Sequence, residues 1–177
     1  MLANTQSTWT VDTGHSEVHF KIKHLGITNV NGTFDLFQGT VHSGQEDFSD
    51  AAVHFEIDTN SINTNNAARD KHLRSPDLFD TEKFPKIIFD GVLKKLNDNY
   101  ELAGKLIICE TARDIILTAV FTGSGKGRFN DLRAGFEVDG KINRKDYGLD
   151  WNILTDAGSF VVGEEVKLHF DIQLIKQ

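Results

Sequence analysis

The sequence is poor in several features that define other classes of protein. It has a single cysteine, Cys109, which excludes an internal disulfide framework. No window approaches the roughly 20 apolar residues of a transmembrane helix. The 19 basic residues are outnumbered by 26 acidic ones, the net charge is −7, and no cluster of lysine and arginine offsets it locally. We therefore expect neither nucleic acid nor an anionic membrane surface as partner, and no stable membrane insertion.

The start of the chain bears on localisation. The first six residues, Met1 to Gln6, have no basic start and no apolar stretch, so they do not have the form of a secretory signal. On this ground we expect a cytoplasmic protein, or a periplasmic one if a leader has been removed. The length and the lack of a linker or repeat predict a single domain over residues 1–177.

Alternation of apolar and polar residues dominates the chain and predicts β-strands. In the first such segment, Val18, Phe20 and Ile22 share one face. The step from Phe34 to Phe37 is odd, and we interpret it as a β-bulge in one continuous strand. About eight strands at hairpin spacing predict an all-β fold, a single antiparallel barrel. Their segments lie near 17–23, 32–41, 53–57, 87–89, 100–108, 115–121, 136–142 and 166–174.

One segment has a different pattern. Residues 64–73 contain a capping residue and side chains that a helix tolerates, and Ser75-Pro76 follow as a helix stop. This predicts one short helix lying across the rim of the barrel.

The interior of such a barrel has two interpretations. An eight-stranded barrel is just wide enough to be filled by side chains or to hold one small ligand. The chain has 13 phenylalanines and strand glycines at Gly32, Gly39, Gly104 and Gly140. The rings and glycines could line an apolar tunnel, or the rings could fill the core while the glycines let the barrel curl. The pattern alone leaves both open.

Polar residues near the expected rim are candidates for a site. His24 continues the inward face of the first strand, so it lies either at the barrel mouth or in a satisfied buried hydrogen bond. Arg69, Asp70 and His72 could form a catalytic or anion-binding set, or simply pin the helix to the rim. On a helix Asp70 is turned about 100° from Arg69, which favours the structural role.

Motifs for metal binding and catalysis are absent from the sequence. His15 and His19 would lie about 13 Å apart on a strand, too far to share an ion. We therefore expect no metal site, no cofactor and an inert buried thiol at Cys109. Gly123 to Gly127 departs from the phosphate-loop pattern and predicts a flexible hairpin loop. An enzyme with His24 or His72 as general base, and a filled barrel without ligand, remain as alternatives.

Several segments, taken together and in order, resemble the YceI-like family of bacterial lipid-binding proteins. The similarity runs from Trp9 to Leu174. Where the family usually has an arginine–glycine turn, this chain has Cys109-Glu110, which leaves the geometry of that hairpin open. The segments that carry the resemblance are Trp9–Ser16, Val18–Phe20, Ile22–Gly26, Val30–Phe34, Phe37–Gly39, Arg69–Ser75, Leu78–Asp80, Phe84-Pro85, Phe89, Gly104–Leu106, Ile142–Gly148 and Val162–Val166.

The resemblance implies an extended, lipocalin-like, eight-stranded barrel without catalytic activity. Its tunnel would bind a polyisoprenoid, such as a quinone or a prenyl-phosphate-like lipid, for transport or storage, and a homodimer is compatible with it. Combined with the alternation, it places His24, Arg69, Asp70 and His72 at the rim beside the lipid head group. Along the tail it places Phe20, Ile22, Phe34, Phe55, Phe89, Leu106, Leu117, Phe121, Phe136 and Phe170.

Overall fold

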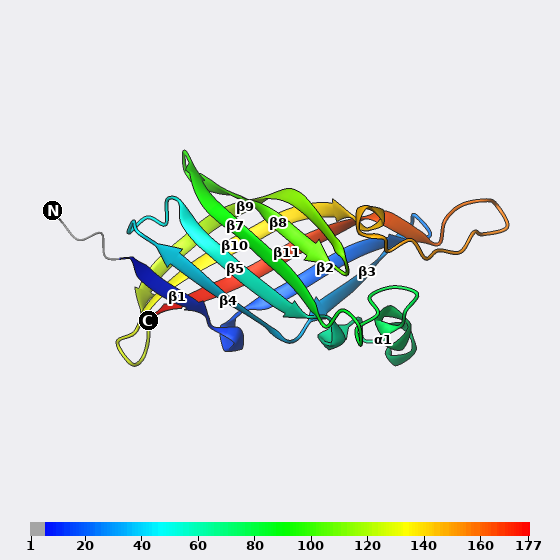
Figure 1. Ribbon diagram of the computed structural model, residues 1–177, viewed down its shortest axis with the longest axis horizontal. Helices are drawn as coiled ribbons and strands as arrows, with labels where there is room; N and C mark the ends of the chain where they lie inside the picture. Colours follow the sequence, from blue (N-terminus) through cyan, green and yellow to red (C-terminus); the bar gives the residue numbers. More distant parts are fainter. Residues whose placement is uncertain (1–5) are drawn as a thin grey trace.

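The computed structural model describes residues 6–177. Residues 1–5, which make up most of the segment behind the expectation about a leader, lie outside this range. The described chain forms one sheet of eleven strands, one α-helix and three short 3-10 helices (Figure 1). The strands are β1 (Ser7–Val11), β2 (Glu17–His24), β3 (Thr28–Phe34), β4 (Phe37–Ser43), β5 (Ala51–Asp58), β6 (Ile62–Asn63), β7 (Lys86–Leu96), β8 (Asn99–Ile108), β9 (Thr111–Lys126), β10 (Leu132–Asn143) and β11 (Val162–Lys176).

Eight of these strands close into an antiparallel barrel. They follow the order β1-β4-β5-β7-β8-β9-β10-β11, and β11 returns to pair with β1 between Leu174–Lys176 and Trp9–Val11. The predicted all-β fold with an eight-stranded antiparallel barrel is thus confirmed. The helix, α1 (Ala67–Arg74), has eight residues, and within residues 6–177 no helix is long and apolar enough to cross a membrane.

The remaining strands extend the sheet at one end of the barrel. β11 pairs with β1 near its C-terminus and with β2 over most of its length, while β3 pairs with β2 and then with β6. At this end, the sheet runs β11-β2-β3-β6 and is not closed onto β5. The open edge is where α1 and the segment after it lie (Figure 1).

The predicted β-bulge between Phe34 and Phe37 is wrong, because the strand is broken there. β3 ends at Phe34, and β4 begins at Phe37 against different partners. The intervening backbone bonds to the 3-10 helix η2 (Thr59–Ser61) instead of to a ladder: Leu36 N–H donates to Ser61 Oγ at 3.0 Å. A bulge does occur in β9: Gly135 of β10 pairs with Gly123 and Phe136 pairs with Phe121, so Thr122 of β9 is the extra residue.

The helix forms where the sequence predicts it, and its ends are set by local hydrogen bonds. The Asn66 side chain accepts from the backbone N–H of Arg69, which satisfies one of the free donors of the first turn. Ser75 caps the C-terminus by donating its N–H to the His72 carbonyl. The following segment folds back, with Phe79 N–H donating to the Leu73 carbonyl at 3.0 Å.

Aromatic rings fill the barrel at the end away from α1. Phe48 packs against Trp9 and Phe136, with ring centroids 5.0 Å and 5.2 Å apart. Tyr100 and Phe121 also pack on Phe136, and the Tyr100 hydroxyl donates to the Asp47 carbonyl. This half of the barrel therefore matches the filled-core interpretation.

The strand glycines seat large side chains of neighbouring strands. A Cβ at Gly39 would lie 2.6 Å from Cδ2 of Phe55. At Gly32, Gly104 and Gly140, an added Cβ would collide with Phe20, Phe89 and Leu117, respectively. Gly32, Gly39 and Gly140 thus each open room for a ring or branched side chain against the sheet. At Gly104, an added Cβ would also collide with the backbone of the neighbouring strand, at the Asp90 carbonyl.

Candidate ligand-binding cavity

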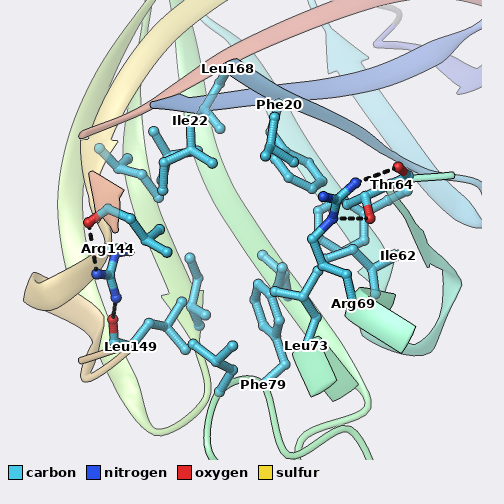
Figure 2. Close-up of a pocket in the computed structure, with 18 of the residues that line it drawn as sticks. Phe20, Ile22, Ile62, Thr64, Arg69, Leu73, Phe79, Arg144, Leu149 and Leu168 are labelled. Carbon is cyan, nitrogen blue, oxygen red and sulfur yellow. Dashed lines mark hydrogen bonds between the residues drawn. The ribbon is translucent and has the colours of Figure 1, made fainter. Parts of the chain in front are cut away.

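A cavity of about 430 Å³ occupies the barrel end beside α1 (Figure 2). This volume lies within the range of small-molecule sites. Most of its wall is apolar and comes from both the barrel and its cover. Figure 2 shows side chains from β2 and β11 facing side chains from α1 and the segment after it across the open space. Among them are Phe20, Ile22, Ile62, Leu73, Phe79, Leu149 and Leu168.

A second, smaller cavity lies deeper in the barrel. It has a volume of about 80 Å³ and an almost wholly apolar wall, to which Val41, Leu102 and Val138 contribute. Phe170 lines both cavities. Its ring therefore stands at the boundary between the two spaces, so that the interior holds a main chamber and a separate small one.

The ten side chains predicted along the tunnel divide into three groups. Phe20, Ile22, Phe34, Leu106 and Phe170 line the main cavity, and Phe55, Leu117 and Phe136 line the small one with Phe170. Phe89 and Phe121 line neither cavity. The ring of Phe89 lies over Gly91 and Gly104, and Phe121 is 37% exposed and packs within the aromatic cluster.

Three of the four predicted rim residues line the main cavity: His24, Arg69 and His72. His24 is half-buried, and within the described chain its ring makes no hydrogen bond, which agrees with the mouth position rather than a satisfied buried one. His72 packs edge-on against Trp151, with ring centroids 4.4 Å apart, and its Nε2 lies 3.1 Å from Asp77 Oδ2.

Asp70 does not line the cavity but fixes a residue that does. It is 6% exposed, and its Oδ1 accepts from both the backbone N–H and the hydroxyl of Thr64. The same hydroxyl accepts from Nε of Arg69 at 2.7 Å. Because a carboxylate only accepts and a guanidinium only donates, the direction of this chain of hydrogen bonds is set. The structural interpretation of Asp70 thus fits, while Arg69 is held at the cavity edge.

Arg144 is a cavity residue that the sequence reasoning did not single out. It begins η3 (Arg144–Tyr147), is 4% exposed, and donates to the carbonyls of Gly163, Leu149 and Trp151. Burial lowers the pKa of its guanidinium, which still remains charged because arginine is not deprotonated in proteins. It fastens the segment 148–163 beside the cavity mouth. Its only signal in the sequence was its place within Ile142–Gly148 of the family resemblance.

Comparison with known proteins assigns the family. A family model described as "YceI-like domain" matches residues 9–174. Protein YceI of Salmonella arizonae is 37% identical over 164 residues, covering 92% of this chain and 83% of the relative, and Protein YceI of Salmonella heidelberg matches equally. The chain belongs to the YceI-like family.

Solved structures agree with this assignment. The YceI protein of Campylobacter jejuni is 30% identical to this YceI-like chain, with a TM-score of 0.71 over 94% of this chain and 96% of the other. BcnA of Burkholderia cenocepacia, at 19% identity, shares the fold with a TM-score of 0.79, covering 92% and 98%. A polyisoprenoid binding domain from Saccharophagus degradans, at 17% identity, shares it with a TM-score of 0.67, covering 96% and 98%.

The hairpin in which this YceI-like chain departs from its family keeps a tight turn. Ile108 pairs with Thr111, so Cys109 and Glu110 form a two-residue connection. Cys109 takes a left-handed φ of +53°, a conformation that favours glycine. Its thiol is partly buried, lies 3.6 Å from the Phe79 carbonyl, and has its pKa raised by burial. The departure therefore leaves the register of β8 and β9 intact.

One group of metal-type ligands that the sequence did not predict includes His19, which also lines the main cavity. Ligand atoms of Glu17, His19 and Asp171 come within 4.8 Å of one another. The pairing of β2 with β11, which sets Glu17 opposite Asp171 and His19 opposite His169, brings them together. His19 Nε2 is already hydrogen-bonded to Glu17 at 2.6 Å, and Glu17 is exposed. No spacing in the sequence could indicate this group, because it depends on strand register.

Proposed function

We propose that the protein binds a long-chain polyisoprenoid or a similar apolar lipid in the main cavity, as a carrier or storage protein. The observation that carries this proposal is the cavity itself, a space of about 430 Å³ with a mostly apolar wall and a few polar groups at its edge. Such a composition suits an amphiphile whose tail is buried and whose head lies at the mouth. The relative from Saccharophagus degradans described as polyisoprenoid binding adds support.

The physical chemistry of the wall explains what such a site selects. Each buried methylene group contributes about 0.8 kcal/mol, so a long tail supplies ample affinity even after much of it is offset by ordering the chain. The depth of the cavity then limits the tail length, and Phe170 stands where the main chamber ends. Polar groups at the mouth discriminate among head groups, whether of the quinone or the prenyl-phosphate type.

The chemistry of the lining favours binding over catalysis. Within the described chain, the main cavity is lined by one hydroxyl, that of Thr64, and by no thiol or carboxylate. The Thr64 hydroxyl is engaged on both sides, by Arg69 and by Asp70. General acid–base work would therefore fall to histidines without a nucleophile to activate.

Calorimetric titration of the delipidated protein with a prenol tests the proposal. Leu168→Lys places a charge in the wall of the main cavity, whereas Leu96→Lys makes the same change at a side chain that is 53% exposed near the β7–β8 turn. We expect Leu168→Lys to weaken binding by about tenfold or more, and Leu96→Lys to leave it unchanged. Thermal melts establish that both variants are folded. Undiminished binding in a folded Leu168→Lys variant contradicts the proposal.

A further inference from the structure

We propose that the head group taken at the mouth of this cavity is anionic, of the phosphate or diphosphate class, rather than an uncharged ring or hydroxyl. This inference rests on the proposed function, since it names the chemistry of the head group for the same cavity. It starts from the sign of the charges that line the cavity.

All the formally charged residues in the lining are basic. They are Lys23, Arg69 and Arg144, accompanied by His19, His24 and His72, and no aspartate or glutamate of the described chain joins them. The chain as a whole has the opposite bias, with 26 acidic and 19 basic residues. A cleft lined by one sign of charge between low-dielectric walls concentrates ligands of the other sign. An acidic protein with a basic cavity mouth is thus arranged to attract an anion.

Arg69 is the residue best placed to contact that anion. Its guanidinium donates to Thr64 through Nε, at 2.7 Å to Oγ1, and through Nη2, at 2.9 Å to the backbone carbonyl. Within the described chain it forms no salt bridge, and its Nη1 makes no hydrogen bond. The planar guanidinium fork matches the geometry of a phosphate. Arg69 therefore offers a preset orientation together with unused donors at the cavity edge.

Neighbouring charged residues determine the electrostatic potential at the cavity mouth. Figure 2 shows Arg144 across the cavity from Arg69. Carbonyl oxygens of Gly163, Leu149 and Trp151 occupy its donors, so it contributes positive charge rather than contacts. Several carboxylates lie nearby without lining the cavity: Glu17 hydrogen-bonds His19 at 2.6 Å, and Glu164 and Asp150 act electrostatically on Arg144. Asp70 is two hydrogen bonds away through Thr64, and the Asp77 carboxylate, 60% exposed, pairs with His72.

The test compares two ligands with the same prenyl tail, one ending in a hydroxyl and one in a monophosphate, on the delipidated full chain. We expect the wild-type protein to bind the phosphate about tenfold more tightly or better, which is the scale of a charge-assisted hydrogen bond. Arg69→Gln should remove most of this preference, because it should weaken binding of the phosphate far more than binding of the prenol, and Arg69→Lys should restore part of it. Arg128→Gln is the control, because it loses the same charge on the exposed β9–β10 loop at the other end of the barrel.

The salt dependence of wild-type binding gives a second measurement that needs no variant. Raising the ionic strength should weaken binding of the prenyl phosphate and leave that of the prenol unaffected. Equal affinity of the wild type for both ligands, or a phosphate preference that survives Arg69→Gln in full, overturns the anionic head group while the proposed lipid binding stands. Failure of both ligands to bind overturns the proposed function together with this inference.

Discussion

The rings of Phe55 and Phe170 stack with centroids 6.3 Å apart and an interplanar angle of 28°. Phe37 also stacks on Phe55, with ring centroids 5.8 Å apart. Phe170 belongs to the walls of both cavities and Phe55 to that of the small one. This stack therefore sets the inner limit of the main chamber, and it determines how much of a long tail the barrel can hold.

Phe170→Ala is expected to join the two cavities and to lengthen the tail that the protein accepts. In the wild type, affinity along a series of prenols should rise and then level off once the main chamber is filled. In Phe170→Ala the affinity should increase several-fold further for at least one more isoprene unit. The free energy of unfolding should fall by about 3 kcal/mol. Phe37→Ala removes a ring of the same stack that lines neither cavity, and it should keep the wild-type plateau. An identical plateau in Phe170→Ala and wild type would show that the ring is no limit.

Tyr147→Phe is expected to stabilise the fold by about 1 kcal/mol. The Tyr147 hydroxyl is buried and, within the described chain, has no hydrogen-bond partner, and burial raises its pKa to about 12. Removing an unsatisfied buried donor relieves its desolvation penalty. Tyr100→Phe is the matched control, since that hydroxyl donates to the Asp47 carbonyl, and its loss should cost about 1 kcal/mol. Urea denaturation measures both, and a destabilised Tyr147→Phe variant would contradict the assignment.

Asp70→Ala is expected to destabilise the protein by about 2–3 kcal/mol, because it leaves the buried N–H and hydroxyl of Thr64 without their acceptor. Asp77→Ala, at a carboxylate that is 60% exposed, should change stability by at most a few tenths of a kcal/mol. Chemical denaturation of the two variants gives the comparison. Similar losses in both would show that Asp70 has no special structural role.

His169 should make stability depend on pH above about 6.5. Its hydrogen bond to Asp139 at 2.7 Å raises its pKa, and Asp171 lies 3.3 Å from its other nitrogen. A raised folded-state pKa means that the stabilisation is fully present below the unfolded value of 6.5 and is lost as pH rises through the folded value. Because the side chain is 42% exposed, solvent screening limits the effect to about 0.5 kcal/mol.

Denaturation of wild type and His169→Gln at pH 6 and pH 8 measures this effect. The difference between the two pH values should shrink in His169→Gln and stay unchanged in His42→Gln, whose ring has a hydroxyl partner, Thr8, rather than a carboxylate. An unaltered difference in His169→Gln would place the pH dependence elsewhere.

Features with a local signal were predictable from the sequence. Alternation around Val18, Phe20 and Ile22 fixes which side chains face the interior, and a capping residue with Ser75-Pro76 defines α1. The same alternation put His24 on the cavity side of β2. The spacing of Arg69 and His72 puts both on one helix face, and it was the family resemblance that placed them at the mouth.

Features that depend on strand register or on three-dimensional packing were not predictable. An odd step between Phe34 and Phe37 is produced equally by a bulge and by a break, and the hydrogen bond of Leu36 to Ser61, distant in sequence, decides between them. Alternation shows which side chains face inward but not how far along the barrel they lie. It therefore could not show that the rings of Phe121 and Phe136 belong to the aromatic cluster at the end away from α1. Nor could it show that Arg144 would fold back onto backbone carbonyls.

Mass spectrometry of the purified full chain, first under native conditions and then after denaturation with organic extraction, tests lipid binding most directly. The account predicts an adduct at close to one equivalent, released on denaturation and identified as a long apolar lipid, or its stoichiometric uptake when a prenol or prenyl phosphate is added. A protein that is empty when purified and takes up neither added lipid would contradict it.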